Sequence, residues 1–305
     1  MDGMNMFRFT RGQQKCCAVH LTAAGLAIAI ATKAPKQPAR IEKLHFIPHS
    51  DEQDELETSL RNFVKQELIL NAPTILVLPG SDYELLRVEK LAVNKKEQQQ
   101  AIIWNIQQRI SIAIEDALIE TFTEPNISTP DKPTHLFTAV SPKKSMLTTI
   151  RLLKRCGLRV TQTTIFELAL LSLLASNDQS EHVACIALSP TTSRFLSAFR
   201  YQLTASHVVP LPEMTPENLS KAALQPLFNE LNRLISYQKQ HVEYFKLFCT
   251  PTTPHFDQLL PLLQENLDMP LEVVSLEPLL AQSSIALDET MVETFPALCG
   301  VFCDE

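Results

Sequence analysis

The chain has 305 residues, of which 45% are hydrophobic and 20% charged, and its formal net charge is −7. This length allows two packed domains, and the composition is that of an ordinary soluble globular protein. A nucleic-acid-binding surface needs clustered positive charge, and no lysine- or arginine-rich block is visible, so nucleic acid is not an expected partner.

Apolar periodicity in the first 78 residues predicts three strands, a helix and a fourth strand, with a tight turn at Gly25 between the first two strands. These elements are expected at 16–21, 26–32, 41–47, 54–68 and 74–78. Residues 16–31 could instead be an export signal, but this apolar run is short for a membrane span of about 20 residues. We therefore favour the hairpin, and a chain that stays in the cytoplasm.

The next 80 residues predict a small α+β module inserted at about 79–160, with the order β-α-β-β-α-β. Asn94 is expected to cap the first helix of this module. Trp104, the only tryptophan, lies in that helix. We expect it to pack the helix onto its sheet, and an exposed interface anchor is the alternative. The strands are expected at 83–91, 117–122, 135–140 and 158–163, and the second helix at 143–156.

A second series of elements follows a buried helix at 165–175 and a polar boundary at 176–181. It repeats the order of the first series: three strands, a helix, then alternating strand and helix. We therefore predict two lobes, 1–180 and 181–305. The expected elements are strands at 182–189, 194–199, 203–210, 244–249 and 271–275, and helices at 216–242, 254–267 and 295–303.

Glycine and cysteine usage are both informative. The chain has 6 glycines, whereas average usage near 7% would give roughly twenty. Loops that wrap phosphates need glycine, so a chain with so few glycines is not expected to form several such loops. The 7 cysteines include no CxxC pair, which predicts reduced, buried thiols and gives no support to a zinc ribbon.

Two segments resemble the PilM/MshI family of pilus-assembly proteins, which includes the MSHA pilus proteins. The first is residues 78–122, and the second is the helix FNELNRLISYQ, where Glu230, Arg233 and Tyr237 fall in register with the family pattern. The matching residues of the first segment are Leu78, Pro79, Tyr83, Leu85, Leu86, Val88, Glu97, Ala101, Trp104, Ile106, Ile110, Glu115, Asp116 and Phe122.

This resemblance implies an α/β protein with the actin-like (ribonuclease H-like) bilobal fold and an inserted module. It implies a location on the cytoplasmic face of the inner membrane, reached through a partner. That partner would be the cytoplasmic tail of a PilN-type bitopic protein. Other platform and motor proteins of the pilus are further expected partners, and the chain could also form a homodimer. A relationship to the cytoplasmic part of the type II secretion protein GspL stays open.

The family is also known for binding ATP, and the three loops that would hold it depart from the expected pattern. The first turn, 20–25, has one glycine and no carboxylate, and the loop at 249–254 has no glycine. The second turn, 187–193, lacks both acid and glycine. Its Thr191, Thr192 and Ser193 remain the candidates for phosphate contact, although such clusters are usually plain turns. We expect no cofactor and no metal.

The sequence therefore favours a non-catalytic scaffold of an MSHA-like type IV pilus machine over an enzyme. An ATP-dependent switch or ATPase is the alternative. The paired acids Glu115 and Asp116 are expected to be solvated rather than catalytic.

Overall fold

The computed structural model describes most of the chain. The described residues are 14–33, 39–49, 53–91, 93–125, 135–178, 180–188, 192–211, 215, 218–253, 255–276, 280, 294–295, 299 and 301. Thr191 and most of the expected C-terminal helix at 295–303 lie outside these ranges.

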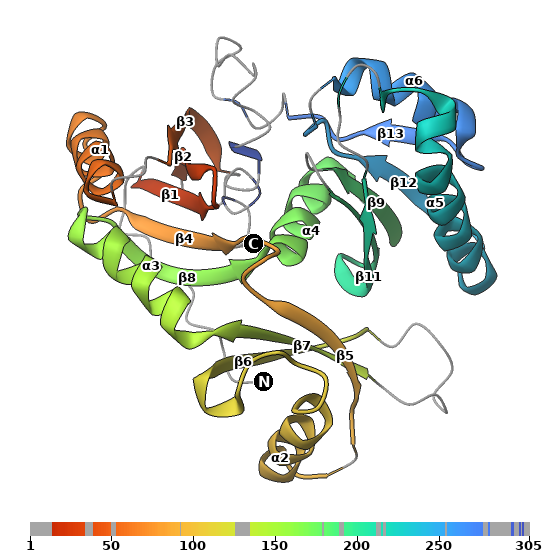
Figure 1. Ribbon diagram of the computed structural model, residues 1–305, viewed down its shortest axis with the longest axis horizontal. Coiled ribbons are helices and arrows are strands. Elements are labelled where there is room, and N and C mark those ends of the chain that lie inside the picture. The colour runs from red at the N-terminus through yellow and green to blue at the C-terminus, as the bar shows by residue number, and fades with distance from the viewer. Residues whose placement is uncertain are drawn as a thin grey trace.

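The first sheet has five strands in the order β3-β2-β1-β4-β8 (Figure 1). The first three strands form an antiparallel meander, and β4 and β8 run parallel to β1. Helices α1 and α3 cover one face of this sheet. The bounds are β1 Gln14–Leu21, β2 Gly25–Lys33, β3 Arg40–Pro48, α1 Gln53–Gln66, β4 Pro73–Leu78, α3 Lys143–Arg155 and β8 Arg159–Ile165.

Alternation along β2 explains how this sheet is buried on both faces. Successive side chains of a strand point to opposite faces. Leu26, Ile28 and Ile30 pack against α1 and α3, whereas the small side chains of Ala27 and Ala29 face the other way, toward α4. Side chains from the continuous apolar run of β2 are thus buried in two separate cores, as expected for a strand inside an α/β layer structure.

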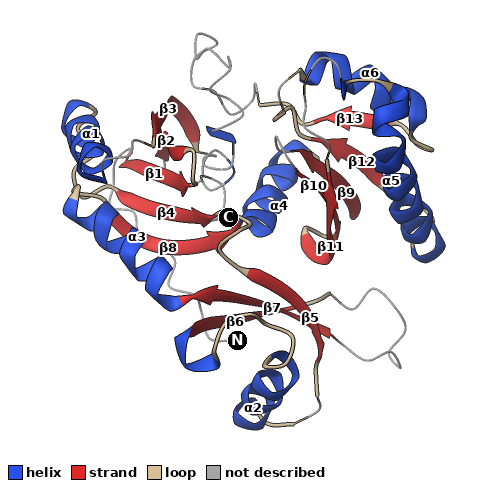
Figure 2. Ribbon diagram, viewed as in Figure 1, coloured by secondary structure: helices blue, strands red, loops and turns tan. Residues whose placement is uncertain are grey.

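The second sheet repeats the same strand order with β11-β10-β9-β12-β13. Helices α5 and α6 cover its outer face (Figure 2). Ser220 caps α5 by accepting a hydrogen bond from the Ala223 N–H (3.3 Å). The bounds are β9 His182–Leu188, β10 Thr192–Phe199, β11 Gln202–Pro210, α5 Lys221–His241, β12 Lys246–Cys249, α6 Phe256–Asn266 and β13 Leu271–Val273.

A third, smaller sheet has the order β5-β7-β6 and carries helix α2. Its elements are β5 Glu84–Glu89, α2 Lys95–Ile106, the 3-10 turn η1 Ile114–Asp116, β6 Ala117–Thr123 and β7 His135–Pro142. The strand β8, which element order alone assigned to this module, pairs with β4 in the first sheet instead. Parallel pairing with β4 makes β8 the edge strand of the larger sheet, which local sequence order does not reveal.

Helix α2 corrects the expectation for Trp104. Ile102 and Ile106 pack against the small sheet, but the Trp104 side chain is 73% exposed. Two residues correspond to about 200° around a helix, so Trp104 points away from the face that carries Ile102. The interface-anchor alternative is the one consistent with this position.

Helix α4, Phe166–Asn177, lies between the two five-stranded sheets (Figure 1). Its Ala169, Leu170 and Leu173 join a core that contains Ala27 of β2 and Cys185 of β9. This core is therefore shared by both sheets, and its small side chains allow close approach.

The described cysteines are buried as predicted, except Cys16, which is partly exposed. Cys17, Cys185 and Cys249 are buried free thiols. Burial raises the pKa of Cys17 and of Cys249 to about 12, so neither is an ionised nucleophile near neutral pH. Among the described helices, none is both long and apolar enough to cross a membrane.

Candidate functional site at the junction of the two lobes

The first of the three turns compared with the family's nucleotide-binding pattern joins β1 to β2, and its own polar groups hydrogen-bond to one another. The Thr22 N–H donates to the Gly25 carbonyl (2.8 Å), and the Thr22 hydroxyl donates to the same carbonyl (3.3 Å) while accepting from the Ala24 N–H (3.2 Å). Gly25 has φ +155°, and a Cβ there would lie 2.3 Å from the Ile47 carbonyl oxygen. The single glycine of this turn is thus needed for contact with β3.

The second turn contains the phosphate-contact candidates Thr191, Thr192 and Ser193. Thr191 lies outside the described residues, and Thr192 begins β10. The buried Ser193 hydroxyl donates to the Val209 carbonyl of β11 (3.5 Å). By strand alternation Ser193 shares a face with Phe195, which packs in the core beneath α5 rather than in the core shared by the two sheets.

The third loop, which follows β12, binds the end of β9 through two buried threonines. The Thr250 hydroxyl accepts from the Leu188 N–H (2.9 Å), and the Thr252 hydroxyl donates to the Leu188 carbonyl (2.7 Å). The two hydroxyls also contact one another at 2.8 Å. Both hydroxyls therefore hold Leu188, the last residue of β9, which lies within the second turn.

The most constrained polar cluster of the junction is centred on Glu167, in the first turn of α4. Its carboxylate has 0% exposure. Arg194 of β10 donates to Oε1 through Nη1 (2.7 Å), and Ser206 of β11 donates to the same oxygen (3.2 Å). The Tyr83 hydroxyl, just before β5, donates to Oε2. One carboxylate thus joins the entry to the small sheet, α4 and the second sheet.

Gly80, in the loop that follows β4, brings the C-terminal end of this inner strand of the first sheet to the same cluster. A Cβ on Gly80 would lie 1.9 Å from Arg194 Nη2, so the guanidinium rests directly on this glycine. A side chain at position 80 would have to displace the guanidinium from its contact with Glu167.

The electrostatics of the cluster suit a structural role. Burial, reinforced by the neighbouring Glu167 carboxylate, raises the pKa of Tyr83 well above its ordinary value, so the phenol remains a hydrogen-bond donor. A buried carboxylate is tolerated when it is paired and its oxygens are satisfied, and here both oxygens accept hydrogen bonds. These side chains can hold the parts of the molecule in a fixed relation.

Sequence reasoning missed Glu167 and Arg194 and treated Tyr83 as a packing residue. A usable signal was present: Glu167 is the only charge in the apolar run 165–175. A charged side chain in a helix buried on all sides requires a partner. Which residue supplies that partner depends on how β10 lies against α4, and this is a tertiary feature.

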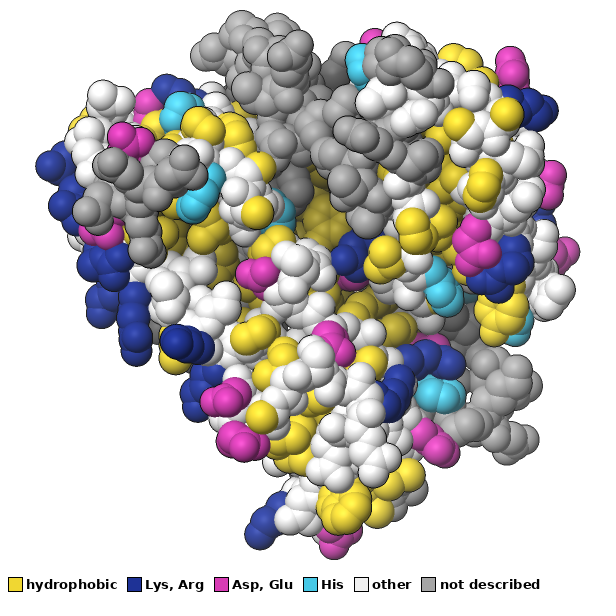
Figure 3. Space-filling view, viewed as in Figure 1, with side chains coloured by type: hydrophobic (Ala, Val, Ile, Leu, Met, Phe, Trp, Pro, Cys, Tyr) yellow, Lys and Arg dark blue, Asp and Glu magenta, His cyan; other side chains and the backbone are white. Residues whose placement is uncertain are grey.

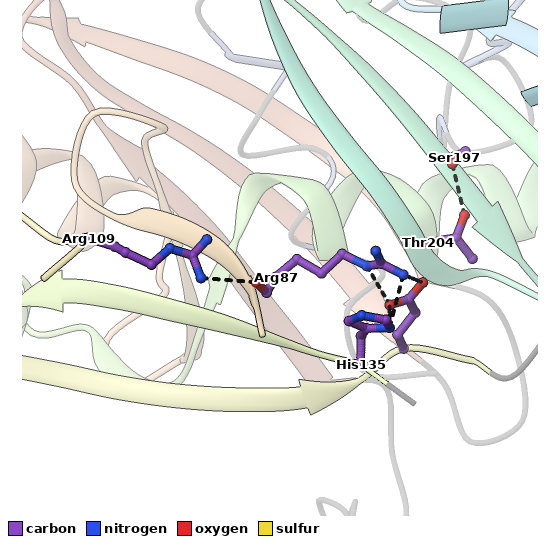
Figure 4. A network of polar contacts seen from close by, with 6 residues as sticks. Arg87, Arg109, His135, Ser197 and Thr204 are labelled. Carbon is purple, nitrogen blue, oxygen red and sulfur yellow. Dashed lines mark hydrogen bonds and ion pairs between the residues drawn. The ribbon is translucent and has the colours of Figure 1, made fainter. Parts of the chain in front are cut away.

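A second polar network ties together the strands of the small sheet (Figure 4). Arg87 of β5 forms two hydrogen bonds with Glu124 (2.7 and 2.8 Å) and contacts His135 of β7 at 3.1 Å. Arg109 donates to the Arg87 carbonyl (3.3 Å). This network is largely exposed, and it links β5 to the residue after β6 and to the first residue of β7. Figure 4 also draws the hydrogen bond between Ser197 and Thr204, which joins β10 and β11.

Within the part of the chain that the structure describes, no three His, Cys, Asp or Glu side chains come together as a metal site.

The duplicated strand order, the interlobe helix and the inserted sheet define the class of the protein. Two sheets of order 3-2-1-4-5 joined through α4 form the actin-like, ribonuclease H-like bilobal fold, with a small α+β module inserted in the first lobe. The predicted fold class is confirmed.

Solved structures share this architecture along nearly the whole chain. The PilM–PilN type IV pilus biogenesis complex matches with a TM-score of 0.68 at 12% identity, covering 96% of this chain and 98% of that chain. The cytoplasmic domain of EpsL, an inner-membrane component of the Vibrio cholerae type II secretion system, matches with a TM-score of 0.51 at 14% identity, covering 93% and 95%. No family model and no curated protein matches the sequence. At these identities the likeness establishes the shared fold.

Proposed function

We propose that this protein is a non-catalytic cytoplasmic scaffold of an MSHA-like type IV pilus assembly machine. It binds the cytoplasmic tail of a PilN-type inner-membrane protein and reaches the membrane through that partner. The resemblance of residues 78–122 and the whole-length likeness to a protein solved in a PilM–PilN complex support the choice of partner.

The observation that carries the non-catalytic part is the Glu167 cluster. Actin-like enzymes and switches work by hinge closure of two lobes around a ligand. Here Glu167 and Arg194 form a buried ion pair across the junction, and the guanidinium also rests on Gly80. Lobe movement would separate these charges without water to replace their contacts, which is costly.

The composition of the loops supports the same conclusion. The first turn has no carboxylate to orient Mg²⁺, an ion that prefers oxygen ligands. Thr22, Thr250 and Thr252 donate or accept within the protein itself. The junction therefore favours a rigid scaffold over a nucleotide-driven switch.

The likeness to the EpsL cytoplasmic domain favours a second candidate, a GspL-like component of a secretion system. The two candidates differ in which machine the protein would serve, a type IV pilus or a type II secretion system.

The decisive experiment measures binding of the purified full chain to a labelled peptide. The peptide carries the cytoplasmic segment of the PilN-type protein encoded in the same genome, and a scrambled version is the control. We expect saturable fluorescence anisotropy with the native peptide only. Equal binding of both peptides, or of neither, would reject the PilN-type assignment.

A thermal-shift titration with Mg-ATP separates the scaffold from the switch. A ligand that binds the native state at 100 times its Kd stabilises it by about 2.7 kcal/mol. We expect the peptide to raise Tm and Mg-ATP at about 1 mM, well above the Kd of a working site, to leave it unchanged. A Tm rise at sub-millimolar Mg-ATP would favour the ATP-binding switch.

A further inference from the structure

Helix α3 gathers positive charge that is not obvious from the sequence. Between positions 141 and 166 the chain has six Lys or Arg residues and no Asp or Glu, although its overall formal charge is −7. The six are Lys143, Lys144, Arg151, Lys154, Arg155 and Arg159. They are spread over 17 positions, so no block is visible in the sequence, and the helix brings five of them together.

The spacing places these cations on the solvent side of α3. Leu152 and Leu153 are buried against the first sheet, whereas Lys144, Arg151 and Arg155 recur at i, i+7 and i+11 and are exposed. Figure 3 shows Lys and Arg side chains following the outer edge of the molecule over α3. The edge of the first lobe is thus a basic strip about 20 Å long, at 1.5 Å per helical residue.

Most of this charge has no acidic partner among the residues that the structure describes. Arg155 pairs with Glu57 of α1 (2.8 Å). Among the described residues, the ion pairs include none from Lys143, Lys144, Arg151 or Lys154 to an acid. These four remain available to an external anion.

Two exposed leucines lie at the C-terminal end of the strip. Leu68 and Leu70 follow α1 and are 82% and 65% exposed. A Cβ on Gly157, two residues after the end of α3, would lie 2.4 Å from Leu70 Cδ1, and the Asn71 N–H donates to the Gly157 carbonyl (2.7 Å). Leu68 has φ +56°, which is unfavourable for a bulky side chain. Neither burial nor backbone preference explains leucine at this position.

We propose that α3 and the 68–70 loop form a docking surface for an anionic phospholipid bilayer. The basic strip would contact the headgroups, and Leu68 and Leu70 would enter the boundary of the acyl chains. Clustered Lys and Arg beside exposed apolar side chains is the combination that interfacial membrane binding uses. An acidic protein surface would complement the charge but leaves the two solvated leucines without a role. This contact is direct and does not require the partner proposed above.

The test is sedimentation of the full chain with vesicles that contain no protein. Vesicles of phosphatidylcholine with about 30% phosphatidylglycerol are compared with pure phosphatidylcholine, at low and high salt. Binding is expected only to the anionic vesicles. It should fall sharply at 1 M salt, where the Debye length shrinks to about 3 Å.

Two variants test the two parts of the surface. Lys144→Glu with Arg151→Glu should lower the vesicle partition coefficient at least about 25-fold, since each cation near the surface contributes about fivefold. Lys96→Glu with Lys221→Glu makes the same charge change at exposed positions of α2 and α5 and should reduce binding far less. Leu68→Asn should weaken binding several-fold while Tm stays equal or rises, because Asn tolerates the left-handed conformation.

Three results would overturn the proposal: no binding to anionic vesicles, equal loss in the matched control, or a fall in Tm for Leu68→Asn with unchanged vesicle binding. If the protein does not bind anionic vesicles, an acidic protein surface becomes the preferred occupant of the basic strip. Because the vesicles lack any PilN-type protein, a negative result here is distinct from failure of the peptide assay.

Discussion

Glu167 is the residue whose environment most restricts what the junction can do. Its partners come from β10, β11 and the segment before β5. Removing one partner of a buried ion pair leaves an uncompensated charge, which costs far more than the net strength of the pair. The cluster is therefore a sensitive probe of how the lobes are joined.

Arg194→Ala is expected to lower the free energy of unfolding by about 3–5 kcal/mol, because Glu167 would keep its burial and lose its cation. Arg233→Ala is the matched control: Arg233 pairs with Glu230 on the exposed face of α5 (2.6 Å). That change should cost at most about 1 kcal/mol. Urea unfolding of both variants measures the difference, and similar losses would contradict the structural role of the cluster.

His20 is a buried histidine of β1 whose Nδ1 lies 3.0 Å from the Val77 carbonyl oxygen. Burial lowers its pKa from 6.5 to about 4, against the opposing effect of the hydrogen bond to Val77. Below pH 6.5 the unfolded chain therefore binds a proton that the folded chain does not. Stability contributed by the neutral ring is present above pH 6.5 and is lost as pH falls toward 4.

As pH falls from 6.5 to 4, we expect protonation of His20 in the unfolded chain to lower the free energy of unfolding. The loss should be about 1.4 kcal/mol for each pH unit and about 3 kcal/mol over the whole interval. His20→Gln should flatten this part of the stability profile measured by urea unfolding. His49→Gln, at an exposed position, should leave the slope unchanged. An unaltered slope in His20→Gln would mean that other groups control acid sensitivity.

At the scale of elements, α2 follows its local signals closely. Asn94 accepts a hydrogen bond from the Glu97 N–H (3.0 Å), as expected for the residue before this helix. Ile102 and Ile106 face the sheet. The cap and the isoleucines were both readable from sequence, and the same helical spacing places Trp104 on the opposite face from Ile102.

Asn94→Ala should weaken the start of α2 by about 1 kcal/mol, the usual cost of losing such a cap. Amide hydrogen exchange of the first turn of α2 should then accelerate about fivefold, with the β1–β4 sheet unaffected. Asn94→Asp, which keeps an accepting oxygen, should exchange like the wild type. Equal acceleration in both variants would show that the side-chain oxygen is not the stabilising group.

At the scale of the whole molecule, one apolar core belongs to both five-stranded sheets. Ala18 and Ala27 from the first sheet, Leu170 from α4, and Cys185 and Phe248 from the second sheet are buried in the same cluster. Opening the lobes would expose this surface to solvent. Unfolding one sheet would likewise expose the inner face of the other sheet.

We therefore expect thermal unfolding in a single calorimetric transition, with the calorimetric and van't Hoff enthalpies equal. Two-state behaviour is the usual result when the core is shared, even though a chain of this length often has separable domains. Two resolved transitions would contradict the shared core. The same scan on Arg194→Ala tests whether the Glu167 cluster contributes to this coupling.

Local sequence determined most of the elements of this protein. The alternation in β2, the apolar run of β4, the cap at Asn94 and the repeated order of strands and helices are short-range patterns set by backbone geometry. They sufficed to predict the duplicated fold.

Tertiary structure alone decided the placement of groups distant in sequence. It paired β8 with β4, brought Arg194 onto Glu167 and Gly80, turned Ser193 toward the outer core, and placed Leu70 at the end of the helix that carries the α3 cations. These contacts depend on which buried surfaces meet when the layers pack, and that is set by the summed burial of many residues. No local pattern encodes it.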